Sequence, residues 1–228
     1  MKIGPHMKAI AWDLDGTVIN SFKIMKLIVG EMAAAKNLPV PTHDMFVQNF
    51  HGTLRETLHN LFGGTMNDVK LDEYFDLFLT TQQKHYESVA EHLIEDAMSL
   101  MERANAAGFK QVLATNRIHE KHGTGSPHSI VASSVLKDHI HEVVAGDTYE
   151  YRKPDPRVLD DFLKKYGLRP HEVLVMGDQF VDAQLALNLG TTGVVVNRDG
   201  LELVGFEQLP SGWEEHITIV PTLHEVEL

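Results

Sequence analysis

Two aspartates lie two residues apart directly after a short apolar run near the start of the chain. They are Asp13 and Asp15, in the segment AWDLDGTVIN of residues 11–20. In extended chain, residues i and i+2 point to the same side, so both carboxylates can face one ligand. Gly16 follows them and gives the backbone the freedom to turn away. The pattern predicts a ligand-facing carboxylate pair at the end of a buried strand.

Polar groups also follow three later apolar runs or lie in the loops after them. In order along the chain they are Thr115 and Asn116, then Lys153, then Asp178 and Asp182. Ligands of open α/β sheets bind beyond the carboxyl ends of the strands, so these groups are expected to converge there. If a helix begins near Gln179, Asp178 and Asp182 bracket its first turn and can approach the same place.

Four carboxylates at one site repel one another strongly. Two unit charges ~4 Å apart cost roughly 4 kcal/mol at an effective dielectric constant near 20. A divalent cation and the ammonium of Lys153 would offset that repulsion. Because the ligand set is hard and consists of oxygen atoms, it suits Mg²⁺.

Six short apolar runs predict the strands that position these groups. They are Lys8–Asp13, Gln111–Asn116, His141–Asp147, Glu172–Asp178, Gly193–Asn197 and His216–Val220. Their hydrophobicity is nearly continuous, which is typical of parallel strands covered on both faces. Helical stretches separate the runs, for example one with Asp155 as N-cap, Pro156 at its first position and Gly167 as its stop. The alternation predicts a doubly wound, Rossmann-like α/β domain.

Residues 21–91 show amphipathic helical stretches and no convincing strand. They predict an all-helical cap domain inserted into a catalytic core of residues 7–20 and 92–228. The alternative is a set of helices packed around the core itself. The opening MKIGPHM suggests that residues 1–6 are left over from an expression tag.

Composition excludes several function classes. The formal net charge is −12 with no concentrated basic stripe, which argues against nucleic acid or an anionic membrane as partner. The absence of cysteine excludes disulfides, thiolate nucleophiles and cysteine zinc sites. No apolar run approaches the ~20 residues of a membrane span, and no secretory signal precedes the first strand. We expect a cytoplasmic protein, monomeric or homodimeric, acting on a small metabolite.

The ordered elements DLDGT, TN, RKPDP and GDQFVD, each following a predicted strand, resemble the haloacid dehalogenase superfamily. The resemblance covers the chain from Lys8 onward. It is to the phosphatase branch with a helical cap, which includes phosphoglycolate phosphatase and β-phosphoglucomutase. Asp15 favours phosphoryl transfer over carbon–halogen cleavage, since the dehalogenase branch differs at that position.

The resemblance implies a role for each residue in phosphoryl transfer. Asp13 would be the nucleophile that forms an aspartyl-phosphate, and Asp15 the general acid and then the base. Thr115 and the backbone amide of Asn116 would bind phosphoryl oxygens. Lys153 would neutralise the transferring group and steady Asp13.

The resemblance also implies the metal and substrate contacts. Mg²⁺ would bind the carboxylates of Asp13 and Asp178 and the backbone carbonyl of Asp15, with Asp182 a ligand or a partner of the ligands. In the cap, His51 and Arg55 of HGTLRETL are candidates for contacting the leaving group, although Arg55 could equally be a surface arginine.

The sequence therefore predicts a Mg²⁺-dependent hydrolase of small phosphomonoesters. An intramolecular sugar phosphomutase of the same fold is the alternative, and a non-catalytic phosphate-binding module is a further one. The segment between TN and RKPDP is longer than the family pattern and includes the Gly/Ser/Pro-rich loop Lys121–Ser129. This loop is either a flap or specificity element, or a plain surface loop.

Overall fold

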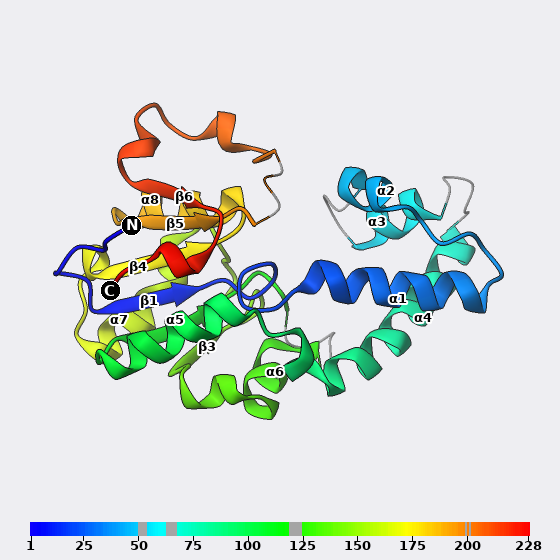
Figure 1. Ribbon diagram of the computed structural model, residues 1–228, viewed down its shortest axis with the longest axis horizontal. Helices are drawn as coiled ribbons and strands as arrows, with labels where there is room; N and C mark the ends of the chain where they lie inside the picture. The colour runs from blue at the N-terminus through cyan, green and yellow to red at the C-terminus, as the bar shows by residue number, and fades with distance from the viewer. Residues whose placement is uncertain (50–53, 63–67, 119–124, 199, 201) are drawn as a thin grey trace. The chain divides into compact units, whose positions relative to one another are not determined.

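A computed structural model describes residues 1–49, 54–62, 68–118, 125–198, 200 and 202–228 (Figure 1). The chain separates into two compact units, one of residues 1–20 with 89–228 and one of residues 21–88. The first unit contains the sheet. The second is an insert between the first strand and the rest of that unit.

One six-stranded sheet forms the framework of the first unit. Its strands are β1 Ala9–Trp12, β2 Lys110–Ala114, β3 Glu142–Val144, β4 Val173–Gly177, β5 Gly193–Val196 and β6 Ile217–Val220. Every neighbouring pair is parallel, in the order β3-β2-β1-β4-β5-β6. All six predicted strands are present, and the predicted α/β class is confirmed.

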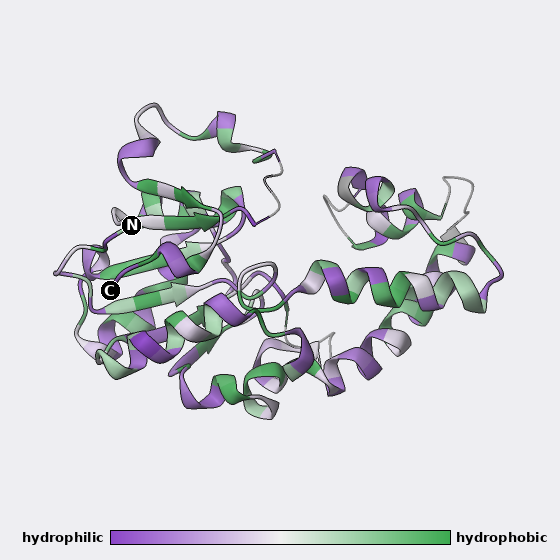
Figure 2. Cartoon of the chain, in the orientation of Figure 1, coloured by the Kyte–Doolittle hydropathy of each residue, from purple (hydrophilic) through white to green (hydrophobic). Residues whose placement is uncertain are grey.

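Both faces of this sheet are covered, which explains the unbroken hydrophobicity of its strands (Figure 2). Ala9 and Ala11 belong to a core cluster with α7, Asp160–Tyr166, and α8, Phe180–Leu189. Alternate residues face the opposite side. There the indole of Trp12 donates to the Gln111 side chain, whose amide donates to the Met101 carbonyl of α5, Glu95–Ala106. This is the doubly wound arrangement that the sequence predicts.

The helix expected after Asp155 forms with one local difference. The Asp155 side chain accepts the amide hydrogen of Arg157, and the first turn, Pro156–Leu159, is 3₁₀ rather than α. Such turns are common where an α-helix begins. The helix α7 then ends at Gly167, whose φ of 63° is left-handed, as glycine permits.

Among its described residues, the second unit contains helices and connecting segments but no strand. Its helices are α1 Ser21–Ala35, α2 His43–Asn49, α3 Leu54–Leu61 and α4 Asp68–Glu87. In α1 the residues Ile24, Ile28 and Met32 are buried at four-residue spacing, the period of one helix face. The helical insert is thus present, whereas the proposed limits of the cap, residues 21–91, stay a prediction.

The two ends of the described chain lie together. The Ile3 amide donates to the Glu227 carbonyl at 2.9 Å, and the Ile3 side chain is buried. A short helix, α6, Pro127–Ser133, completes the first unit. Among the described residues, no helix has the length and apolar character needed to cross a membrane.

Candidate active site

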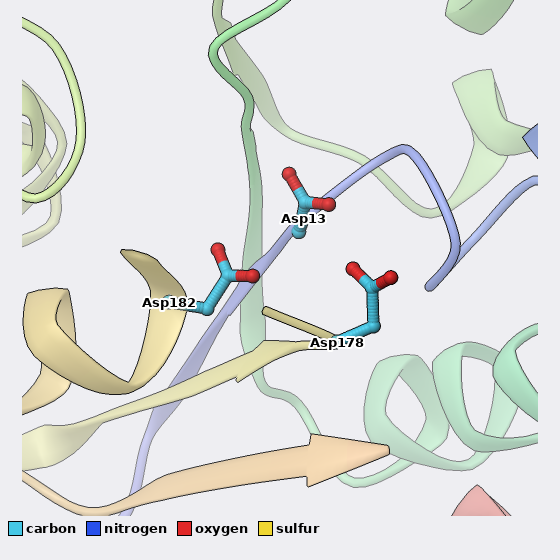
Figure 3. Close-up of side chains that lie close together, drawn as sticks. All are labelled: Asp13, Asp178 and Asp182. Carbon is cyan, nitrogen blue, oxygen red and sulfur yellow. The ribbon is translucent and has the colours of Figure 1, made fainter. Parts of the chain in front are cut away.

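Three aspartates meet at the carboxyl ends of β1 and β4 (Figure 3). The two strands are parallel neighbours with Trp12 opposite Met176, and the Asp13 amide donates to the Met176 carbonyl at 2.7 Å. Asp13 therefore emerges beside Asp178, and Asp182 joins them from the first turn of α8. Each offers a carboxylate oxygen within 4.8 Å of the others. The sequence predicts that these three aspartates converge at this edge of the sheet, and in the structure they do.

Lys153 lies between two of these carboxylates. Its Nζ is 2.5 Å from Asp13 Oδ1 and 2.7 Å from Asp182 Oδ1. Only 3% of the Lys153 side chain is exposed, so the three charges interact largely out of water. The other oxygen of Asp182 accepts the Gln179 amide hydrogen at 3.2 Å. Asp182 thus holds Lys153 with one oxygen and caps α8 with the other.

The site carries more negative charge than Lys153 balances. Burial, followed by the nearby charges of Asp182 and Asp15, raises the pKa of Asp13 to about 7 against the pull of Lys153. Burial and the charge of Asp13 also raise the pKa of Asp178 well above its usual range. Burial alone would lower the pKa of Lys153, but the two carboxylates beside it raise that pKa. The lysine is therefore a fixed cation, and a further cation would stabilise both ionised aspartates.

The turn after β1 fits closely around Asp178. Gly16 has a φ of 78°, and a Cβ on it would lie 2.1 Å from Asp178 Oδ2. The Thr17 hydroxyl donates to Asp178 Oδ1 at 3.4 Å. The turn closes through the Gly16 amide, which donates to the Ile19 carbonyl at 2.9 Å. A glycine is required here because the backbone passes next to a carboxylate in a left-handed conformation.

The loop after β2 contacts the segment that carries Lys153. Thr115 is buried, and its hydroxyl accepts the Arg117 amide hydrogen at 3.1 Å. The side-chain amide of Asn116 donates to the Lys153 carbonyl at 3.0 Å. The Asn116 Oδ1 is buried and has no hydrogen-bond partner among the described residues. The peptide bond between Lys153 and Pro154 is cis.

Asp15 does not join the three-aspartate cluster through its carboxylate. Both of its oxygens are bound by the guanidinium of Arg117, with Nε 3.0 Å from Oδ2 and Nη2 on Oδ1. Arg117 Nη1 donates to the Gly125 carbonyl at 3.0 Å. The sequence prediction missed Arg117, although its place directly after Thr115 and Asn116 was a signal for it.

A second arginine that the prediction missed braces the same turn from the other side. Arg198 donates to the Gly16 carbonyl at 2.8 Å, to the Thr17 carbonyl at 3.3 Å and to Asp96 Oδ1 at 2.6 Å. Asp96 is buried, and its other oxygen accepts from the Thr222 hydroxyl and the Leu223 amide. The turn of Gly16 and Thr17 is thereby tied to α5 and to the C-terminal segment.

Arg55, one of the two predicted cap contacts, belongs to the second unit. Arg55 forms an exposed ion pair with Asp72, and its guanidinium lies 4.9 Å from the ring centre of Phe75. His51 and the segment Lys121–Thr124 of the Gly-rich loop lie outside the described residues. In the rest of that loop, the Ser126 hydroxyl caps α6 by accepting the Ser129 amide hydrogen at 3.3 Å.

The sequence and the fold are similar to those of proteins of known family. A family model for haloacid dehalogenase-like hydrolases matches residues 10–196. The phosphoglycolate phosphatase of Aliivibrio fischeri is 29% identical over 206 residues, which cover 81% of this chain and 81% of that protein. The phosphoglycolate phosphatase of Aquifex aeolicus is 26% identical over 208 residues, with coverage of 90% and 89%.

Solved structures agree on the fold. A subfamily IA hydrolase of the same superfamily from Geobacter sulfurreducens superposes with a TM-score of 0.70 at 19% identity, covering 85% of this chain and 88% of that chain. The resemblance carried by the four ordered motifs is confirmed. This chain belongs to the haloacid dehalogenase-like hydrolase family.

Proposed function

We propose that this protein is a Mg²⁺-dependent phosphatase that hydrolyses small phosphomonoesters through an aspartyl-phosphate on Asp13. The observation that carries the proposal is the group of Asp13, Lys153 and Asp178 at one edge of the sheet, in which Asp13 and Lys153 are buried. It brings together a carboxylate that would serve as the nucleophile, a fixed cation and a second carboxylate. Phosphoryl transfer depends mainly on such positioning and charge compensation.

The chain's own residues fit a hard divalent cation. The carboxylates of Asp13 and Asp178 and the backbone carbonyl of Asp15 would hold it. The raised pKa values of both aspartates support this assignment, because burial and then the neighbouring carboxylates disfavour the ionised forms, which a bound cation would stabilise. The Gly16 turn supports it too, since a side chain there would occupy the space beside Asp178. When bound, Mg²⁺ supplies positive charge to the phosphoryl oxygens during transfer.

In this proposal Asp182 holds Lys153 and does not bind the metal. Its two oxygens already accept hydrogen bonds, one from Lys153 and one from the Gln179 amide. Asp182 therefore fixes the lysine, and the lysine steadies Asp13 and neutralises the incoming phosphoryl group.

The proton transfers fall to Asp15. An Asp13 oxygen bonds to phosphorus while the bond to the leaving oxygen breaks, and protonated Asp15 gives that oxygen its proton. The Asp15 carboxylate then takes a proton from water, the water oxygen bonds to phosphorus, and the bond to Asp13 breaks. Thr115 lies at the end of β2, next to β1, where its hydroxyl and the Asn116 amide would bind phosphoryl oxygens.

The second unit would select the substrate through His51 and Arg55. Arg55 would exchange its exposed partner Asp72 for an anionic group of the substrate. Phosphoglycolate is our first candidate substrate, because the named relatives are phosphoglycolate phosphatases. We place the enzyme in the cytoplasm, as a monomer or homodimer acting on a small phosphorylated metabolite.

The test is phosphate release from a panel of small phosphomonoesters with Mg²⁺ or with a chelator. We expect metal-dependent release that Asp13→Asn abolishes and that Asp138→Asn, at an exposed carboxylate of the same unit, leaves intact. Release by Asp13→Asn at the wild-type rate would refute the mechanism. Slow release combined with isomerisation of a sugar phosphate would favour the mutase, and no turnover of any kind would favour a binding module.

A further inference from the structure

Arg117 and Asp15 form a bidentate ion pair at the mouth of the proposed site. Nε and Nη2 of the guanidinium reach the two different oxygens of the carboxylate. The Arg117 side chain is 10% exposed and the Asp15 side chain 29% exposed, so the pair is largely shielded from water. A two-point contact of this kind fixes the plane of a carboxylate, which a single contact does not.

Arg117 is itself held rigidly at three points. Its amide donates to the Thr115 hydroxyl, its carbonyl accepts the Gly146 amide hydrogen at 2.9 Å, and its Nη1 donates to the Gly125 carbonyl. Gly125 directly precedes Ser126, the N-cap of α6. The guanidinium therefore presents a fixed surface to Asp15.

The two cations of the site contact different carboxylates. Lys153 contacts Asp13 and Asp182, whereas Arg117 contacts Asp15. Asp15 is thus oriented by a different group from the one that steadies the nucleophile. A group that must serve a leaving oxygen and later a water molecule gains most from a fixed orientation.

We propose that Arg117 is the positioning residue for Asp15, acting in both proton-transfer steps through the orientation of that carboxyl group. The inference rests on the proposed phosphatase function. Arg117 itself exchanges no proton and forms no bond to phosphorus. It works by restricting the rotation of Asp15, with Gly125 as its anchor.

The test is a double-mutant cycle of Arg117→Gln and Asp15→Asn, measured as phosphate release from an alkyl phosphate. We expect Arg117→Gln to lower kcat roughly 10- to 100-fold, a part of the 10²- to 10⁴-fold that a positioned acid–base group supplies. In the Asp15→Asn background the same substitution should have no further effect, because the residue acts through Asp15. Arg117→Lys should restore little, since an ammonium cannot make the two-point contact.

A second readout separates positioning from general structural support. With 4-nitrophenyl phosphate, whose leaving group needs little protonation, the first release of 4-nitrophenol by Arg117→Gln should keep its rate. The later steady-state rate, which needs Asp15 as base, should fall, so a burst should appear or grow. Arg157→Gln is the matched control, because on the exposed surface Arg157 Nε donates to Asp155 Oδ1 and Nη2 donates to Oδ2, the same two-point contact. It should behave as wild type.

The outcomes distinguish this inference from the proposed function. Additive losses in the double mutant, or wild-type turnover by Arg117→Gln, would overturn the positioning role while leaving the phosphatase in place. If Arg117→Gln does not fold, Arg117→Lys enters the same cycle with the same expectation of non-additivity. Absence of release by the wild-type protein would refute both, since Asp15 would then have no proton to transfer.

Discussion

Asp13→Asn should make the metal-free protein more stable while it abolishes turnover. The nucleophile is buried among other carboxylates, and its pKa is raised from 3.8 to about 7, first by burial and then by the charges around it. The ionised form therefore destabilises the fold whenever no metal compensates it. Asparagine has nearly the same shape, carries no charge, and can still accept the hydrogen bond from Lys153.

The size of the expected stability change follows from the pKa shift of Asp13. A group whose pKa is higher in the folded protein contributes stability at low pH, and that contribution is lost as pH rises toward the folded value. At ~1.4 kcal/mol per pKa unit, a shift of about three units amounts to ~4 kcal/mol at pH 8 and to ~2 kcal/mol at pH 5. For a unit of this length the larger figure corresponds to a rise in Tm of roughly 8–16 °C.

Thermal melting in a chelating buffer at pH 5 and pH 8 measures this directly. Asp13→Asn should melt above wild type at both values, with the larger difference at pH 8. Added Mg²⁺ should raise the Tm of the wild type at pH 8 and that of the variant less, because binding to the folded state stabilises it. Asp138→Asn, at an exposed carboxylate, should change neither the Tm nor its response to Mg²⁺.

The reasoning would be refuted if Asp13→Asn melted below wild type at pH 8 without metal. That result would mean that Lys153 more than compensates the Asp13 charge, and that the site holds no excess negative charge for a cation to relieve. An equal response of both proteins to Mg²⁺ would remove Asp13 from the metal ligands.

Three further predictions concern the groups around the nucleophile. Lys153→Met should abolish turnover and lower the free energy of unfolding by about 3–5 kcal/mol at pH 8, as measured by denaturant titration, because it leaves buried carboxylates unpaired. Gly16→Ala should raise the Mg²⁺ concentration needed for half-maximal phosphate release and lower stability by ~1–2 kcal/mol, since its Cβ would meet Asp178 in a left-handed backbone. Asp96→Ala should lower stability by about 3 kcal/mol at pH 7, because it leaves the Arg198 guanidinium without its ion pair. Despite burial, the hydrogen bonds from Arg198, Thr222 and Leu223 lower the pKa of Asp96. Its contribution to the stability of the fold should therefore be complete above ~pH 4 and should decrease as the pH falls further. Thermal melts of the wild type and Asp96→Ala across that pH range measure this decrease.

The strands could be predicted because burial on both faces leaves a direct record in the sequence. Runs such as VLVM in β4 have no polar residue on either face, and parallel pairing requires that coverage. Helix ends were equally readable where one residue type suits one backbone conformation, as at Gly167. The first turn after Asp155 differs, since whether a turn is 3₁₀ or α depends on packing that the local sequence does not record.

The contacts that shape the site were less accessible from the sequence. Asp15 and Arg117 are 102 residues apart, as are Asp96 and Arg198. Arg117 directly follows the TN motif, but the motif does not indicate which carboxylate the arginine binds, and Arg198 belongs to none of the four motifs. A charged residue shows no periodicity that would reveal its partner. The spacing of Asp178 and Asp182 correctly placed both at one edge, but it could not show that Lys153 engages Asp182.

The charge balance of the site explains why these two cations and a divalent metal belong together. Four carboxylates, those of Asp13, Asp15, Asp178 and Asp182, meet two fixed cations, Lys153 and Arg117. With all of these groups ionised, two negative charges remain, and one divalent cation neutralises them. A phosphomonoester dianion then enters a site of zero net charge, or of one net positive charge when Asp15 holds the proton for the leaving oxygen, although the whole chain carries a formal charge of −12. Removing Lys153 or Arg117 should therefore weaken binding of the substrate dianion, although it leaves more negative charge to attract a metal cation. Removing Asp182 should chiefly release Lys153.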